Sequence, residues 1–200
     1  MVNSKKKRFT LFTLSADEGS ITKGFTLIEL LVIIGIIAIT TSAGLFSYNT
    51  LSKEQTLSST SKKMIDVLNL TRKRAIAGDT SRGCTGSLQY YKFSKTSASQ
   101  YDVKVKCTGS SETTLQSYSM ASNNLVQMNS MTIMPANTTI TGINFSGFNG
   151  EISGDATLGT VIVTGTDYVD LTIRVPSLGK CISITINSLG VVTEGEKVSC

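Results

Sequence analysis

A single carboxylate, Glu29, lies within an apolar run that covers residues 25–46. The run is long enough to cross a bilayer as a helix. A charge inside such a span costs on the order of 3 kcal/mol, so we expect a neutralising partner. If the chain is cut after Gly24, the new amino group of Phe25 can meet Glu29 of a neighbouring subunit and fix the axial register of a helical assembly. The alternative is a single-pass anchor in which Glu29 is protonated or lies at the membrane interface.

Four cysteines form a second group of residues with reactive side chains, and all of them follow the apolar run: Cys84, Cys107, Cys181 and Cys200. No two have the Cys-x-x-Cys spacing typical of zinc or thioredoxin-like sites. An even number outside a membrane segment indicates disulfides in an oxidising compartment. Of the three connectivities we favour Cys84–Cys107 and Cys181–Cys200, because each closes a short loop within one expected hairpin region. The alternative is four free thiols in a reducing compartment.

The chain contains no histidine, which is the commonest general base and the commonest metal ligand. Its serines therefore lack the usual activating base, and its acidic residues are scattered. We expect no enzymatic activity, no cofactor and no metal site. The net charge is +5, and most of it belongs to residues 1–24, which fits a flank that stays in the cytoplasm.

A long helix is predicted after this flank. We interpret residues 1–24 as a leader that is removed during processing. Apart from Glu29, residues 25–46 carry no charge, and they contain no proline. Their apolar residues are continuous and not periodic, as expected of a helix with apolar surroundings on all sides. Over residues 47–78, apolar residues recur at helical intervals between charged ones, which predicts an amphipathic continuation of the helix; they are Leu51, Leu57, Met64, Ile65, Leu68 and Ile76. Gly78 and Asp79 are a stop signal, so we expect one helix from Phe25 to about Ala77.

Residues 79–200 are expected to form a β-rich globular head domain. Apolar and polar residues alternate over 101–107, 168–175 and 182–187, which is typical of half-buried antiparallel strands. Residues 187–190 predict the turn of a final hairpin. Residues 108–132 are rich in polar residues and methionine and predict an exposed loop or an irregular edge. The expected fold class is α+β, with the long N-terminal helix packed on a C-terminal antiparallel sheet.

The sequence Lys-Gly-Phe-Thr-Leu-Ile-Glu-Leu-Leu-Val at residues 23–32 resembles the N-terminal motif of type IV prepilins. In that motif a glycine precedes the cut, the next phenylalanine is N-methylated, and a glutamate is the fifth residue of the mature chain. The resemblance implies cleavage by prepilin peptidase between Gly24 and Phe25, methylation of Phe25, and a role for Glu29 in subunit docking. Beyond the motif, a long helix followed by a mainly β domain looks like minor pilins and pseudopilins of the FimT and GspH type.

This resemblance implies a structural subunit, a minor pilin or pseudopilin, of a type IV pilus or a type II secretion pseudopilus. Its partners would be other pilin or pseudopilin subunits, prepilin peptidase and the inner-membrane assembly platform. Before assembly it would be a single-pass membrane protein with an extracytoplasmic head. After assembly it would lie in a pilus or a periplasmic pseudopilus.

A basic cluster lies at the end of the expected helix, formed by Arg72, Lys73 and Arg74 with Arg82 nearby. Minor pilins of this type include some that bind DNA, so one interpretation is a phosphate-binding patch. A solvated helix end, where cations also interact favourably with the helix dipole, is the interpretation we prefer.

The strongest alternative function is a secreted soluble binding domain. Residues 30–40 would then be the apolar region of an ordinary signal peptide, with cleavage after Ala43. The first residue of the mature chain, Phe25 or Gly44, separates the two interpretations.

Overall fold

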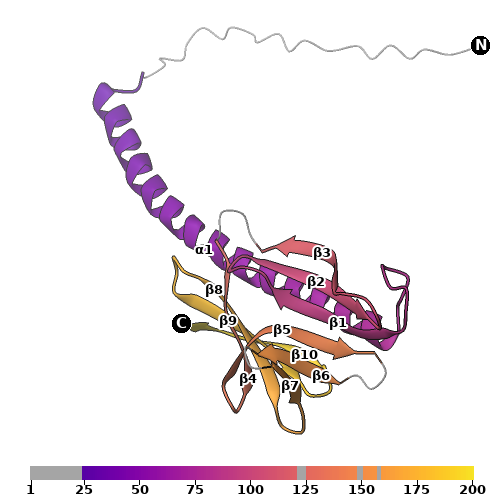
Figure 1. The fold of residues 1–200 in the computed structure, drawn as a ribbon. Helices are drawn as coiled ribbons and strands as arrows, with labels where there is room; N and C mark the ends of the chain where they lie inside the picture. The colour runs from indigo at the N-terminus through magenta and orange to yellow at the C-terminus, as the bar shows by residue number, and fades with distance from the viewer. Residues whose placement is uncertain (1–23, 121–124, 148–150, 157–158) are drawn as a thin grey trace, which may run out of the picture. The chain divides into compact units, whose positions relative to one another are not determined.

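The computed structural model describes residues 24–120, 125–147, 151–156 and 159–200, without the side chains of residues 43–46. The expected leader lies outside these ranges except for Gly24. The chain divides between Gly44 and Leu45 into two compact units. Helix α1 covers Leu27–Ile76 and includes this boundary (Figure 1).

Helix α1 ends at the predicted stop signal. Gly78 has a φ of 61°, a left-handed conformation that glycine adopts without steric cost. Its N–H donates to the carbonyl of Ala75 at 3.0 Å, and the N–H of Asp79 donates to the carbonyl of Arg74 at 3.1 Å. This pair of hydrogen bonds is a Schellman motif, which satisfies carbonyls that the helix leaves free.

The second half of α1 buries one face, as its periodicity predicts. The buried apolar side chains on this face are Leu57, Met64, Leu68 and Ala75. They lie seven, four and seven residues apart, so they share one side of the helix. Of the other residues in the predicted set, Ile65 is partly buried, whereas Leu51 and Ile76 are 56% and 51% exposed. Both exposed residues lie at the ends of the predicted stretch, beyond the buried set.

In the described part of the chain, the head contains ten strands, all in antiparallel pairs. They are β1 (Leu88–Lys95), β2 (Gln100–Cys107), β3 (Thr113–Ser119), β4 (Gln127–Met134), β5 (Thr138–Ser146), β6 (Ile152–Ala156), β7 (Gly159–Val163), β8 (Tyr168–Val175), β9 (Lys180–Asn187) and β10 (Val192–Ser199). One long helix followed by an antiparallel sheet confirms the predicted fold class.

Strand β5 joins two arms of this sheet. At its start, Thr138 and Thr139 pair with β4, which leads through β8 and β9 to β10. Further along, residues 140–146 pair with β6 on one edge and β1 on the other. One arm therefore has the order β4-β8-β9-β10, and the other has the order β7-β6-β5-β1-β2-β3 (Figure 1).

A single core of buried apolar side chains includes residues from α1 and from both arms. The predicted alternation is clearest in β2 and β8, where every second residue is buried. Each strand therefore presents one face to the core and one away from it, as expected for a sheet covered on one side. The predicted final hairpin is also present, because the turn between β9 and β10 follows Asn187.

The expectation of an exposed loop or irregular edge over residues 108–132 is only partly right, since β3 is a largely exposed edge strand with a register shift, whereas the first part of β4 has buried residues. Strand β3 has no fully buried residue, and among the strands that the structure describes it pairs with β2 alone, so its sequence shows no clear alternation of buried and exposed residues. Strand β4 has a register shift between Met128 and Ser130. The shift sets Met128 and Met131 three residues apart on the buried side, which breaks the two-residue period that sequence patterns detect.

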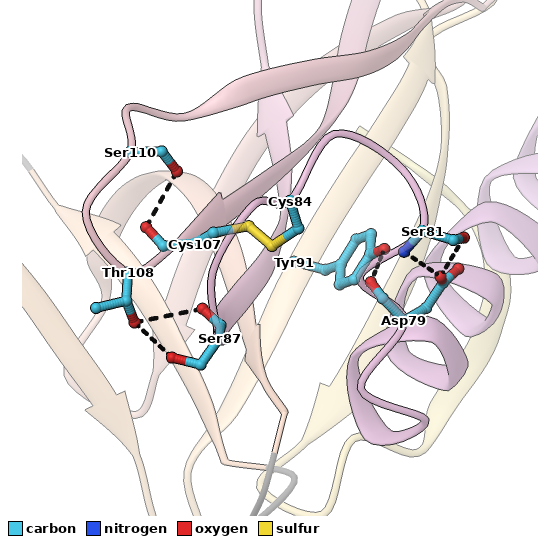
Figure 2. The surroundings of a disulfide bond; sticks show 8 residues. All are labelled: Asp79, Ser81, Cys84, Ser87, Tyr91, Cys107, Thr108 and Ser110. Atoms are coloured by element: carbon cyan, nitrogen blue, oxygen red, sulfur yellow. Dashed lines mark hydrogen bonds between the residues drawn. A yellow bond between two sulfur atoms is a disulfide. The ribbon is translucent and has the colours of Figure 1, made fainter.

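Two disulfides tie the ends of strands to neighbouring segments, and the described residues contain no free cysteine. Cys84 and Cys107, with Cα atoms 5.7 Å apart, link the segment after α1 to the last residue of β2 (Figure 2). Next to them, Thr108 and Ser87 join the same two segments through their side chains at 2.8 Å and through the N–H of Thr108 to the carbonyl of Ser87 at 2.9 Å.

The second disulfide closes the open end of the last hairpin. Cys181 lies at the start of β9, Cys200 follows β10, and their Cα atoms are 5.4 Å apart. The N–H of Cys200 also donates to the carbonyl of Gly179 at 2.9 Å. Strand β10 is almost entirely exposed, and within the described part of the chain β9 is the strand that pairs with it, so this cross-link adds an important constraint.

Two leucines on the second half of α1 allow a matched test of helix packing. Leu68 is fully buried, whereas Leu70 is 41% exposed. Leu68→Ala should lower the free energy of unfolding by about 2–5 kcal/mol, and Leu70→Ala by clearly less, because only the first leaves a cavity. Denaturant unfolding of the detergent-solubilised chain, followed by circular dichroism, measures both. Equal losses for the two variants would contradict the described packing.

The disulfide between Cys181 and Cys200 should act locally. Replacing both by serine should cost about 3 kcal/mol, because the loop-closure entropy of the unfolded chain is restored. Amide hydrogen exchange should rise throughout β10 and much less in β9, which β8 also pairs. The control is the double replacement of Cys84 and Cys107, which should leave exchange in β10 unchanged. A rise in β10 in that control would argue against a local role.

Candidate assembly site

The residues expected to be processed lie directly before α1. Gly24, Phe25 and Thr26 precede the first helical residue. The hydroxyl oxygen of Thr26 accepts a hydrogen bond from the N–H of Glu29 at 3.3 Å. The carbonyl of Thr26 also accepts from the N–H of Leu30 at 3.2 Å. Thr26 is therefore the N-cap of the helix, and it satisfies backbone groups that the first turn leaves free.

Glu29 is exposed in the first turn of α1. Its carboxylate lies at the positive end of the helix dipole, which stabilises a negative charge there. Residues 24–44 contain no Lys or Arg. The first unit therefore offers no basic side chain to pair with Glu29 within its described residues.

The first part of α1 exposes large apolar side chains on all sides. Phe25, Leu27 and Ile39 are 73%, 82% and 73% exposed, and the large apolar residues between them are exposed as well. By length and composition, this helix is apolar enough to cross a membrane. Such a surface is unfavourable in water and indicates contact with lipid or with other apolar chains.

The basic cluster is divided between different environments. Arg72 donates from Nη2 to the carbonyl of Leu189 at 2.7 Å, in the turn between β9 and β10. A Cβ atom at Gly190 would clash with the Arg72 side chain, which lies directly over this glycine. Arg74 is half-buried, whereas Lys73 and Arg82 are exposed. Arg72 therefore connects the helix to the last hairpin, and this contact competes with phosphate binding.

Two other members of the cluster lie near an acid. Asp79 Oδ1 accepts hydrogen bonds from the side chain and the backbone of Ser81, at 2.6 Å and 3.0 Å (Figure 2). These bonds lower the pKa of Asp79, and the charges of Arg82 and Arg74 lower it further. The carboxylate stays ionised and reduces the positive potential that a phosphate would meet. The Asp79 carbonyl accepts from the hydroxyl of Tyr91 at 2.6 Å, which anchors this turn to β1.

Two functional contacts were not predicted from the sequence. The N-cap has a recognisable signal, since Thr26 and Glu29 have the spacing of a capping box. The contact between Arg72 and Leu189 joins residues 117 positions apart, and nothing local in the sequence marks it.

Comparisons with known proteins agree with the N-terminal geometry. Residues 20–45 match the prokaryotic N-terminal methylation motif. A solved structure of the type IV minor pilin FimU of Pseudomonas aeruginosa (strain PAO1) is similar to 73% of this chain and 92% of that chain, with 13% identity and a TM-score of 0.47. The curated proteins include no match to this sequence. This chain therefore carries the N-terminal methylation motif that type IV pilins have, on one long helix that an antiparallel sheet follows.

Proposed function

We propose that this protein is a minor pilin or pseudopilin, cut by prepilin peptidase between Gly24 and Phe25 and built into a filament through the first part of α1. The observation that carries the proposal is the methylation motif on a helix whose apolar side chains are exposed. The inner-membrane assembly platform and other pilin subunits are its partners. The head domain remains outside the cytoplasm, in a pilus or in a periplasmic pseudopilus.

The energetics support assembly by this helix. Removing apolar surface from water is favourable, and moving it between lipid and a bundle of apolar helices changes the free energy little. Lipid and a bundle of similar helices are therefore both suitable environments for this helix. The carboxylate of Glu29 is the exception, because it is expensive in lipid. Pairing with the amino group of Phe25 in a neighbouring subunit offsets that cost only in the assembled state. The pairing then specifies the axial position of each subunit, which is the best-supported use of a buried ion pair.

No phosphate contact is part of this proposal. Arg72 is engaged with the last hairpin, and Arg74 and Arg82 lie near Asp79. The four basic residues therefore fit a solvated helix end better than a DNA-binding surface.

Processing should depend on Gly24. A side chain at this position would meet no atom of the chain within 4 Å, so Gly24→Val should leave the fold intact. We expect it to block cleavage, because the peptidase requires the small residue before the cut. Gly35, which also has open space around it, provides the control, and Gly35→Val should still be cut. Mass spectrometry of the N-terminus measures the outcome. Normal cleavage of Gly24→Val, or a mature chain that starts at Gly44, would contradict the proposal.

Assembly should depend on the side chain of Glu29. Glu29→Ala keeps the N-cap, because Thr26 accepts from the backbone N–H of residue 29. Cleavage should be unaffected, whereas incorporation into filaments should fall at least about tenfold, which corresponds to about 1.4 kcal/mol. Glu54→Ala, on the second half of the same helix, is the matched control. Immunoblots of sheared filaments measure incorporation, and equal yields for the two variants would rule out the docking role.

A further inference from the structure

A lysine and two carboxylates meet on the sheet face that points away from the core. Tyr91 and Phe93 of β1 are fully buried, so Lys92 between them points to the other face. Its Nζ contacts Asp155 Oδ2 on β6 and lies 3.1 Å from Glu112 Oε1 in the segment before β3. The three side chains are only 12%, 25% and 29% exposed, in the order Lys92, Asp155 and Glu112.

Lys92 reaches Asp155 across an intervening strand. On β5, which lies between β1 and β6, Lys92 pairs with Asn144 and Asp155 pairs with Gly142. A Cβ atom at Gly142 would lie 2.8 Å from Lys92 Cε and 3.1 Å from the carbonyl oxygen of Phe93, so the glycine leaves room for the lysine to cross the strand diagonally. The backbone thus provides a path that leads the amine to one carboxylate.

Two further residues orient the carboxylates. The buried side chain of Asn144 donates from Nδ2 to Asp155 Oδ1 at 2.9 Å, which leaves Oδ2 to contact the amine. The hydroxyl of Tyr90 donates to Glu112 Oε1 at 2.8 Å. The Lys92 amine therefore lies between two carboxylates. Asp155, oriented by Asn144, presents its carboxyl carbon to the amine, and Glu112 is able to carry a proton.

We propose that Lys92 and Asp155 form an intramolecular isopeptide bond that joins β1 to β6 across β5. This proposal does not depend on filament assembly. The side chains supply every atom of the reaction, since an ammonium and a carboxylate condense to an amide and one water. Held in contact, reacting groups have effective concentrations on the order of 10⁵–10⁸ M, which favours condensation over hydrolysis.

The steps assign Glu112 the role of proton carrier. Glu112 takes one proton from Lys92 Nζ, and the freed electron pair of the nitrogen forms a bond to Cγ of Asp155 while the π pair of the carbonyl group moves onto its oxygen. A second Nζ proton passes to the Asp155 oxygen that will leave, and Glu112 returns the first proton to the same oxygen. The remaining oxygen then re-forms its double bond to Cγ, the bond from Cγ to the protonated oxygen breaks with its electron pair staying on that oxygen, and water leaves. The third proton remains as the amide N–H, and Glu112 ends as it began.

The charged forms are the resting state before the reaction. Burial acts to lower the pKa of Lys92, but hydrogen bonds and charges from Asp155 and Glu112 outweigh it and raise the pKa overall. The neutral amine is therefore a minor form. A bond that forms once in the life of each molecule needs no rapid turnover, so a small population of the neutral amine is sufficient.

The test is peptide mapping of the full chain, purified in detergent, reduced, alkylated and digested with trypsin followed by a protease that cuts after glutamate. Cleavage after Glu151 separates Asn144 from Asp155. We expect the peptides that contain Lys92 and Asp155 to be joined, with a mass one water below their sum, and no tryptic cleavage after Lys92. Free peptides with cleavage after Lys92 would overturn the proposal. A bond from Lys92 to Asn144 with loss of ammonia would also overturn it.

Variants assign the roles. Lys92→Arg keeps the positive charge and should give only unlinked peptides, with both disulfides still formed as evidence that it folds. Lys104→Arg, opposite Lys92 on β2, is the matched control and should leave the cross-link complete. Glu112→Gln keeps an acceptor for Tyr90 but carries no proton, so the linked fraction should fall at least tenfold. An unchanged linked fraction in Glu112→Gln would overturn the proton-carrier role.

Discussion

The structure depends on the burial of one face of α1 in the core of the head. Leu57, Met64 and Leu68 are fully buried there with side chains from both arms of the sheet. The sheet alone would present an apolar face to water, and the helix alone would present an apolar stripe. Each covers the other, which is the usual way in which an α+β domain obtains a single core. The contact of Arg72 with the turn after β9 and that of Tyr91 with the turn after α1 secure the end of the helix.

The sequence predicts those parts of the fold whose pattern is local and regular. The helix, its stop at Gly78 and the alternating strands β2, β8 and β9 follow from periods of 3.6 and 2. Strands β3 and β4 were missed for different reasons, since β3 has no fully buried residue and the register shift near Met128 interrupts the period of β4. The N-terminal motif was recognisable because a glycine, an aromatic residue and an acid occupy fixed places at the start of an apolar run.

The polar face of the sheet was less accessible to sequence reasoning. Lys92, Glu112 and Asp155 are widely separated along the chain, and each resembles an ordinary surface charge. The pairing of β1, β5 and β6 brings Lys92 and Asp155 together, and the pairing of β1, β2 and β3 brings Glu112, directly before β3, close to them. The need for glycine at position 142 has the same origin, because its neighbour is a side chain from another strand. Such arrangements depend on register, and register is fixed by tertiary structure.

The strand order has a consequence for when the head can fold during synthesis. Strand β8 lies between β4 and β9, although it follows β4 by more than thirty residues. The arm that contains β4 therefore stays incomplete until the ribosome has released residues well past β8. Until then, the buried face of α1 lacks the core residues that this arm supplies. A chain of this topology gains little from folding while it is being made.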